Sequence, residues 1–317
     1  MEPQEFFVKR FLTLALLFQS IMTFSVESHN MTISTLIFSE NGKKLYSASF
    51  DSTGILWDVA TGNSLYRTGG QRGFMTSMAI SNKLNIMLTA ARDKTIAIRS
   101  LNGKIIRTVL GHSDSVNYVI IRDNSVYSAS DNGEVIFWNL PSMNRLKVLK
   151  FPANGIDAMS LSPDGKILLA GCVDGKIRVI DVKKMKVMKE ISAHNGYVFS
   201  LYFIGNNRFI SGSANGELSL WDAKSFSLIK KNPTAGKGIL SLIVYQNNIF
   251  AGTKTGNLIV FDVNNLNALK SYKISDKGIN ALAVSPGTGL IASGDDIGVI
   301  RLIKADTGAI LMTLGNN

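Results

Sequence analysis

The chain has 317 residues, and 45% of them are hydrophobic, which is ample for a set of packed sheets. Lys and Arg outnumber Asp and Glu by 34 to 23, and the resulting net charge of +11 directs attention to acidic or polyanionic partners. The single cysteine, Cys172, excludes an internal disulfide and a multi-cysteine zinc site, and it indicates a reducing compartment.

Residues 1–19 form an apolar extension ahead of the repetitive part of the chain. A basic pair precedes an apolar run at 11–24, as in a signal peptide, and Asn30 begins a glycosylation sequon. The run follows two acidic residues and is shorter than the roughly 20 residues that span a bilayer. The extension is therefore either a signal or anchor, or a segment that packs against the rest of the chain.

Residues 20–317 consist of one unit repeated seven times. Each unit has three short apolar runs, rich in β-branched or aromatic residues and separated by turns containing Asn or Gly, and a fourth run follows. The unit is clearest at 194–222, where Trp221 ends the third run. The equivalent positions, here named the register residues, are Trp57, Arg99, Trp138, Ile180, Trp221, Phe261 and Ile303. They lie 39 to 42 residues apart, and a period of about 40 with four strands is typical of a propeller blade.

The repeats differ in the polar residues that they keep. Repeat two has Arg99 at the register position, which predicts a loosely packed blade or a guanidinium that reaches outward. Repeats six and seven have Thr255 and Ile297 where other repeats have an acid or an amide. We therefore expect apolar packing alone to hold these two repeats together.

The pattern resembles the WD40 repeat, which has a His-bearing turn, a Ser-rich second strand, an Asp and a third strand ending in Trp-Asp. This resemblance implies an all-β, seven-bladed propeller of four-stranded antiparallel blades. All three His and all three Trp fall in repeats one, three and five, 26 to 28 residues apart. In the family, these residues form a buried hydrogen-bond network with a Ser and the acid, and losing a partner there costs roughly 1–3 kcal/mol. The implied network residues are His29, Asp51 and Trp57, then His112, Asn132 and Trp138, then His194, Asn215 and Trp221.

Two segments are candidates for the strand that closes the ring. The family completes its last blade with an N-terminal strand, which would here lie at 20–26. The C-terminal run at 309–314 follows a hairpin turn and would close the blade locally. One of the two is surplus to seven four-stranded blades, and the sequence does not separate them.

A search for catalytic motifs finds none. Repeat position explains all three His, so none is left for a catalytic triad or a metal site. The glycines lie in hairpin turns at blade spacing and not in phosphate-binding loops. We therefore expect a non-enzymatic protein without a metal or a cofactor.

The resemblance also implies a binding surface. In WD40-like propellers, the residues three and five after the repeat His and the residue before the acid face the narrow top opening, where partner peptides dock. The residues singled out at these positions are Phe50, Phe74, Arg92, Tyr197, Phe199, Leu240 and Lys254. Aromatic residues and Arg dominate interface hot spots, which favours a scaffold or adaptor that binds proteins or peptides. The alternative for Tyr197 and Phe199 is that they pack between blades.

Lysines gather in the segments expected to form the outer strands of the middle blades. This basic rim consists of Lys147, Lys183, Lys184, Lys186, Lys189, Lys230 and Lys231. Such a rim can bind RNA or an anionic membrane, which gives an alternative function. It can also merely block edge-to-edge aggregation of exposed strands, and we favour this explanation.

The stretch Trp-Asp-Ala-Lys at 221–224 gives another alternative function. It resembles the box of propellers that serve as substrate receptors of cullin-type ubiquitin ligases, with Lys in place of the usual Arg.

For location, the lone cysteine favours the cytoplasm or nucleus over secretion. We expect a monomeric ring that acts within larger complexes.

Overall fold

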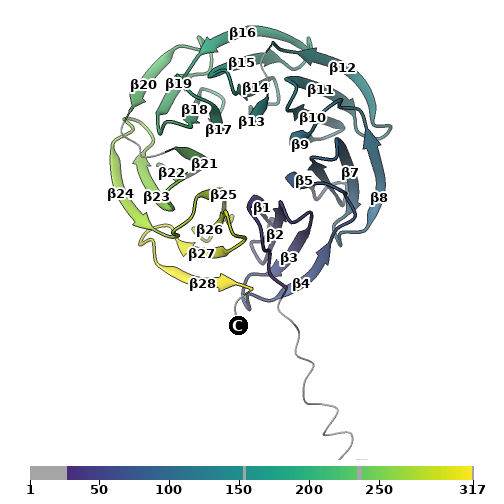
Figure 1. Ribbon diagram of the computed structural model, residues 1–317. Coiled ribbons are helices and arrows are strands. Elements are labelled where there is room, and N and C mark those ends of the chain that lie inside the picture. The colour runs from purple at the N-terminus through teal and green to yellow at the C-terminus, as the bar shows by residue number, and fades with distance from the viewer. Residues whose placement is uncertain (1–26, 153–154, 234–237, 316–317) are drawn as a thin grey trace, which may run out of the picture.

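The computed structural model describes residues 27–152, 155–233 and 238–315. These residues form 28 strands in seven sheets, which stand around a central channel as the blades of a propeller (Figure 1). Each sheet has four antiparallel strands in sequence order, so the predicted seven-bladed all-β fold is confirmed. In the described part of the chain, no helix is long and apolar enough to cross a membrane.

Within each blade, the first strand lines the channel and the fourth lies on the outer circumference (Figure 1). Blades one to three contain β1 (Ile33–Phe38), β2 (Lys44–Ser49), β3 (Gly54–Asp58), β4 (Ser64–Thr68), β5 (Met75–Ser81), β6 (Ile86–Ala91), β7 (Thr95–Ser100), β8 (Ile105–Leu110), β9 (Val116–Arg122), β10 (Ser125–Ser130), β11 (Glu134–Asn139) and β12 (Asn144–Lys150). Blades four and five contain β13 (Ile156–Leu161), β14 (Ile167–Cys172), β15 (Lys176–Asp181), β16 (Lys186–Ser192), β17 (Val198–Ile204), β18 (Arg208–Ser213), β19 (Leu218–Asp222) and β20 (Leu228–Asn232). Blades six and seven contain β21 (Ile239–Tyr245), β22 (Asn248–Thr253), β23 (Asn257–Asp262), β24 (Ala268–Lys273), β25 (Ile279–Val284), β26 (Leu290–Asp295), β27 (Ile300–Lys304) and β28 (Ile310–Leu314).

The seven register residues occupy equivalent places in the third strand of every blade. Trp57 pairs with Leu45 of β2, Arg99 pairs with Met87 of β6, and the other five pair in the same way. At each of the seven, the pairing of the third strand with the fourth shifts by a bulge. One residue position per repeat therefore identifies the strand register around the whole ring.

The hydrophobic core lies between neighbouring blades. The second and third strands are almost fully buried because both faces of each sheet pack on a neighbour, as Val179 of blade four packs in one cluster with Phe209 of blade five. The fourth strands are largely exposed. The ring therefore depends on contacts between successive repeats, as expected of a repeat architecture.

Blades one and seven meet through side chains. Ile33 and Trp57 of blade one pack in one cluster with Ile300 and Leu314 of blade seven. Leu314 belongs to β28, which pairs with β27, so the C-terminal run supplies the outer strand of blade seven. The extension at 1–19 and the run at 20–26 lie outside the described residues.

Candidate functional site

The polar network of blade one joins the turn before β1 to β2 and β3. The Nε2 atom of His29 lies 2.8 Å from the Ser47 hydroxyl, and the indole N–H of Trp57 donates to the same hydroxyl over 2.8 Å. The Nδ1 atom of His29 lies 2.8 Å from Asp51. With the proton on Nδ1, Nε2 accepts from Ser47, so each nitrogen of His29 and Trp57 has a partner.

Blade three builds this network with a different carboxylate. His112 Nε2 lies 2.6 Å from the Ser128 hydroxyl, to which the Trp138 indole donates over 2.8 Å. Asn132 does not reach the imidazole as expected, because its side chain is bonded to Ser130 at the end of β10 and to Ser113. Glu134, two residues further on, faces His112 Nδ1 at 3.6 Å. Burial lowers the pKa of His112 to about 4, against the opposing attraction of Glu134.

In blade five too, a glutamate and not the predicted asparagine faces the histidine. His194 lies 2.7 Å from the Ser211 hydroxyl, and the Trp221 indole donates to that hydroxyl over 2.8 Å. Asn215 accepts from a serine within its own turn, whereas Glu217 lies 2.5 Å from His194 Nδ1. Burial lowers the pKa of His194, although Glu217 opposes this shift. In blades three and five, the acid of the network therefore lies two residues after the predicted position.

Blade two replaces the histidine and the tryptophan by Gln71 and Arg99. The Arg99 side chain is fully buried at 0% exposure, and its Nε donates to the Thr89 hydroxyl over 2.9 Å. Its other nitrogens donate to Thr68, to two backbone carbonyls and to Gln71. The Thr89 hydroxyl donates to Gln71 over 2.6 Å. The prediction of a loose blade or an outward guanidinium is therefore wrong, because five neutral oxygen acceptors hold Arg99 inside.

Blade four is held by a bidentate ion pair. Arg178, two residues before the register residue, is buried and donates to both carboxylate oxygens of Asp174, over 2.8 and 2.7 Å. Its guanidinium carbon lies 5.2 Å from the centre of the Phe151 ring. Such paired bonds fix both charge and orientation, so this blade has a polar anchor without histidine or tryptophan.

Blades six and seven are not held by apolar packing alone, contrary to the prediction. In blade seven, the buried Asp295 accepts from Arg301 and from Ser275, each over 2.8 Å. In blade six, the hydroxyls of Thr253 and Thr255 lie 3.1 Å apart. The polar anchor of blade seven stands on the second strand, two residues before the predicted acid position at Ile297.

Gly111 precedes His112 at a place where a larger residue does not fit. A Cβ atom at residue 111 would lie 2.1 Å from the Trp138 ring, which is buried. Gly111→Ala is therefore expected to lower the free energy of unfolding by about 1–3 kcal/mol. Urea unfolding followed by tryptophan fluorescence measures the change. Ser28→Ala, at the equivalent exposed position of blade one, is the matched control, and an equal effect of the two substitutions would contradict the clash.

The top face is the end of the ring at which the loops between second and third strands meet the loops leading into the first strands. In every blade, the residue that precedes the acid position donates its backbone N–H to the residue that precedes the first strand. Phe50 donates in this way to Thr32 over 2.9 Å, and Arg92 donates to Phe74 over 3.0 Å. This hydrogen bond occurs once in each of the seven blades. It places the residue before the acid position and the residue before the first strand around the opening.

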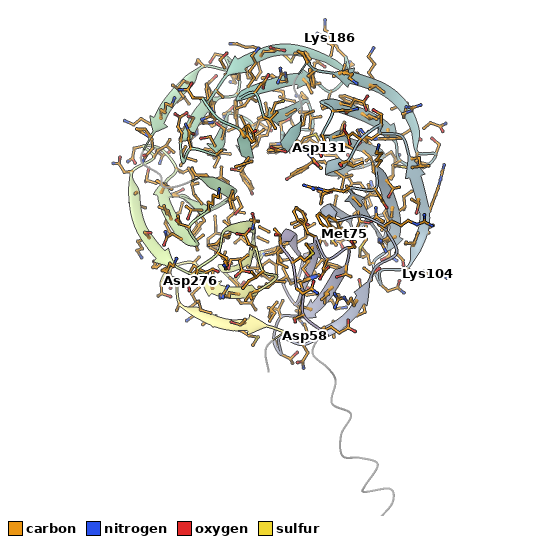
Figure 2. The ribbon with its side chains drawn as sticks, viewed as in Figure 1. Asp58, Met75, Lys104, Asp131, Lys186 and Asp276 are labelled. Carbon is orange, nitrogen blue, oxygen red and sulfur yellow. The ribbon has the colours of Figure 1, made fainter. Side chains whose placement is uncertain are left out.

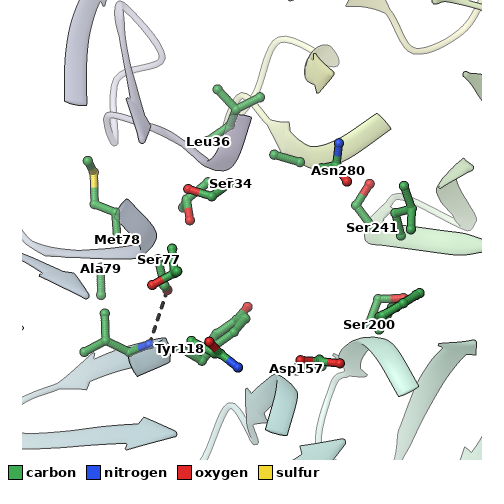
Figure 3. A pocket seen from close by; sticks show the side chains of 18 of the residues that line it. Ser34, Leu36, Ser77, Met78, Ala79, Tyr118, Asp157, Ser200, Ser241 and Asn280 are labelled. Atoms are coloured by element: carbon green, nitrogen blue, oxygen red, sulfur yellow. Dashed lines mark hydrogen bonds between the residues drawn. The ribbon is translucent and has the colours of Figure 1, made fainter. Parts of the chain in front are cut away.

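A cavity of about 710 Å³ occupies the channel and is lined by residues of all seven blades. Serine hydroxyls and aliphatic side chains make up much of its wall, together with the carboxylate of Asp157 (Figure 3). The predicted top-face residues that line it are Phe50, Arg92, Phe199 and Leu240. Phe74, Tyr197 and Lys254 lie outside the lining, and the rings of Phe74 and Tyr197 contact the lining residues Phe50 and Phe199.

Two aromatic groups stand on the top face. The rings of Phe50 and Phe74 are stacked, with centroids 5.3 Å apart and planes 7° from parallel. The guanidinium carbon of Arg92 lies 5.6 and 5.3 Å from their centres, within cation–π range. In blade five, Tyr197 and Phe199 meet edge to face at 5.8 Å. Tyr197 is 49% exposed, so this ring does not pack between blades.

Three carboxylates also surround the opening, and the sequence did not single them out as binding residues. Asp131 accepts from Asn117 over 2.5 Å, and Asp296 accepts from Asn280 over 2.6 Å. Burial raises the pKa of Asp157 to about 6, and repulsion from Asp131 adds to this shift. Figure 2 shows Asp131 at the inner edge of the ring. The net-basic protein therefore has an acidic group of side chains at its channel.

The seven lysines of the predicted basic rim are all exposed. Three have partners, since Lys184 lies 3.6 Å from Asp181, Lys231 lies 2.8 Å from Glu217, and Lys189 donates to a backbone carbonyl. The rim lysines whose side chains make no hydrogen bond or ion pair to any described residue are Lys147, Lys183, Lys186 and Lys230. Lys186 projects from the outer circumference (Figure 2). The structure thus places the rim far from the top-face aromatic residues.

No group of three or more His, Cys, Asp or Glu suited to a metal ion occurs within the described ranges. Burial raises the pKa of the Cys172 thiol to about 11, which keeps it protonated and unreactive at neutral pH. The top face presents stacked aromatic rings, a guanidinium and carboxylates.

Comparison with known families identifies WD40 sequences in two parts of the chain. The profile of the WD domain, G-beta repeat, matches residues 18–58, and the profile of the anaphase-promoting complex subunit 4 WD40 domain matches residues 78–206. Together these ranges cover more than half of the chain. They contain the complete polar networks of blades one and three, whereas most of blade five lies beyond residue 206.

Similar proteins include the WD repeat-containing protein 91 homolog of Dictyostelium discoideum, 28% identical over 62% of this chain and 27% of its own length. Autophagy-related protein 16 of Arabidopsis thaliana is 22% identical over 68% of this chain and 43% of its own. Pre-mRNA-processing factor 17 of Homo sapiens is 26% identical over 64% of this chain and 37% of its own length. The matched region thus spans less than half the length of each of these relatives.

Two solved structures share the fold. U3-55K superposes with a TM-score of 0.76 at 20% identity, covering 86% of this chain and 90% of that one. The computationally designed Ika8 protein superposes with a TM-score of 0.68 at 22% identity, and the match covers 88% of this chain and 98% of the Ika8 chain. With the two matching WD40 profiles and seven four-stranded blades in one ring, the chain belongs to the WD40-repeat β-propeller family.

Proposed function

We propose that the chain is a non-enzymatic scaffold whose top face binds partner proteins or peptides. It would act as a monomeric ring within larger complexes, in the cytoplasm or the nucleus. WD40 propellers are generally scaffolds for protein interactions and not enzymes. The names of its relatives refer to processes as different as autophagy and pre-mRNA processing, so the family does not identify the pathway.

The stacked pair of Phe50 and Phe74 beneath Arg92 is the observation that carries this proposal. Aromatic and arginine side chains contribute most of the binding energy at interfaces. Here they are assembled before any partner arrives, so little side-chain entropy remains to be lost on binding. The channel beside them supplies a concave surface into which a partner side chain can enter.

A combined Phe74→Ala and Tyr197→Ala variant is expected to weaken partner binding by at least about tenfold, because it removes one anchor from each aromatic group. Affinity capture with quantitative mass spectrometry identifies the partners, and titration of a purified partner measures the change. Leu84→Ala is the matched control, because Leu84 is exposed in the turn between β5 and β6 at the opposite end of the blade. Partners that bind both variants equally would contradict a top-face site.

The ubiquitin-ligase alternative has less support. Trp221 of the four-residue box is buried and bonded to Ser211, and Asp222 accepts from the backbone of Lys224 and Ser225 in its turn. Structural contacts therefore account for two of the four residues that suggested it.

A further inference from the structure

Every outer strand of the ring has a large aliphatic residue at the same register. In blade one, Trp57 pairs with Ser64 and the next residue is Leu65, and each other blade has an aliphatic side chain at this place. This aliphatic belt consists of Leu65, Ile106, Leu146, Met188, Ile229, Leu269 and Leu311. Their side chains are between 47% and 61% exposed. The circumference of the ring therefore presents apolar groups to solvent at a regular spacing.

Positive charge is not distributed evenly along this belt. The outer strands of blades three, four and five, β12, β16 and β20, contain many lysines and are consecutive around the ring (Figure 1). The four lysines without partners all lie on these strands or in the turn before β16. We name this part of the circumference the cationic arc, with Lys147, Lys183, Lys186 and Lys230 as its free lysines and Leu146, Met188 and Ile229 as its belt residues.

The outer strands of blades six, seven and one, on the side opposite the arc, lack free charge of this kind. In blade seven, β28 has no charged residue, and in blade six Lys270 and Lys273 donate to backbone carbonyls. In blade one, Arg67 is paired with Asp51. The one acid on the outer strands of the arc, Glu190, lies 3.1 Å from Lys176. The arc therefore attracts anions more strongly than the opposite side of the ring.

The combination of side chains on the arc distinguishes between anionic partners. A nucleic acid uses cations on its phosphates and aromatic rings on its bases, but the three outer strands of the arc contain no aromatic residue. Exposed aliphatic groups gain nothing from a phosphate backbone. At an anionic membrane, lysines meet the headgroups while neighbouring aliphatic side chains enter the headgroup and acyl boundary.

We propose that the cationic arc docks the ring edge-on to an anionic lipid membrane. The contact is centred on Met188 of β16, and the long lysine side chains of the flanking strands reach the headgroup layer on either side. This orientation leaves the top face free, so membrane docking and partner binding are compatible and independent.

Sedimentation with vesicles tests the proposal, using purified full-length protein. Phosphatidylcholine vesicles that contain phosphatidylserine are expected to bind the protein, and vesicles of phosphatidylcholine alone are not. A charge variant and an aliphatic variant should each reduce the binding constant at least about tenfold. The charge variant combines Lys147→Ala, Lys186→Ala and Lys230→Ala. The aliphatic variant combines Leu146→Ser, Met188→Ser and Ile229→Ser.

The belt provides a matched control on the opposite side of the ring. This control combines Leu65→Ser, Leu269→Ser and Leu311→Ser, at the same register but away from the arc, and it is expected to bind vesicles like the unaltered protein. Thermal unfolding checks that all variants fold. Absence of sedimentation with phosphatidylserine vesicles would overturn the proposal. It would also be overturned if the aliphatic variant bound normally while the charge variant did not, because the arc would then act on any polyanion, RNA included.

Discussion

Replacing Arg99 with alanine is expected to lower the free energy of unfolding by about 3–5 kcal/mol. The substitution removes five donor contacts at once, so the Gly69 carbonyl loses its donor, while Gln71 and Gly103 keep only the bonds donated by Thr89 and Thr68. It also opens a cavity where a fully buried guanidinium stood. Urea unfolding followed by tryptophan fluorescence measures the loss, since the indoles of blades one and three lie on either side of blade two.

Two further substitutions separate the causes. Arg99→Met fills most of the volume but provides no donor, so the loss that remains reports the lost hydrogen bonds. Arg107→Ala removes an exposed arginine of the same blade and is expected to change stability by less than about 1 kcal/mol. If Arg99→Ala cost no more than Arg107→Ala, the guanidinium would be solvated and blade two would be as loose as its sequence suggested.

The strand register of the ring could be predicted because one residue per repeat marks it. Trp57, Trp138 and Trp221 are rare residues at constant spacing, and the turns between strands contain residues that tolerate the required backbone angles. The bulge at each register residue then repeats with the same period. The strand that closes blade seven could not be predicted, because both candidate runs had the composition of a strand.

The polar networks of the other blades could not be found by searching for His, Asp and Trp. Gln71 lies 28 residues before Arg99, the same spacing that separates His29 from Trp57. The pair was missed because both members changed together, which preserves the hydrogen bonds while changing the residue types. Spacing alone, without residue type, would have indicated it.

The acid of the network changes place for a related reason. In blade one, Asp51 and Thr53 both contact the imidazole, at 2.8 and 3.3 Å from Nδ1. Blade three has Asn132 and Glu134 at these two positions, so the carboxylate moves to the second of them. A side chain at either position can reach the Nδ1 atom of the histidine, although the two positions are two residues apart in the sequence. Predictions that assign one role to one position miss this exchange.

The binding surface shows the same limit. Repeat positions placed Phe50, Phe74 and Arg92 at the top opening, but the contact of Arg92 with both rings depends on two neighbouring blades. The perturbed carboxyl of Asp157 likewise depends on burial and on Asp131 of blade three. Contacts between side chains of neighbouring blades depend on the three-dimensional structure, so the sequence pattern of a single repeat does not predict them.

Asp157→Asn is expected to stabilise the protein by about 1–2 kcal/mol at pH 7. The carboxyl pKa is raised from 3.8 to about 6 in the folded state, so the folded chain binds its proton first. The stability from this proton is complete below pH 3.8 and is lost as the pH rises through 6. At pH 7 the buried carboxylate therefore weakens the fold, and the neutral amide removes that cost. Asp123→Asn, at an exposed carboxyl of blade three, is the control and should change little.

His112 acts in the opposite direction over the same pH range. Its pKa is lowered from 6.5 to about 4 in the folded state, mainly by burial, so the unfolded chain binds the proton first. Its contribution is present above pH 6.5 and is lost as the pH falls toward 4, and His194 adds to this loss. Between pH 6.5 and pH 4, the unaltered protein therefore combines a loss from the histidines with a gain from Asp157. The Asp157→Asn variant keeps only the loss, so its stability should fall more steeply with acid and approach that of the unaltered protein near pH 4. Unfolding free energies at a series of pH values test this, and parallel curves for the two proteins would show that Asp157 titrates as an ordinary surface carboxylate.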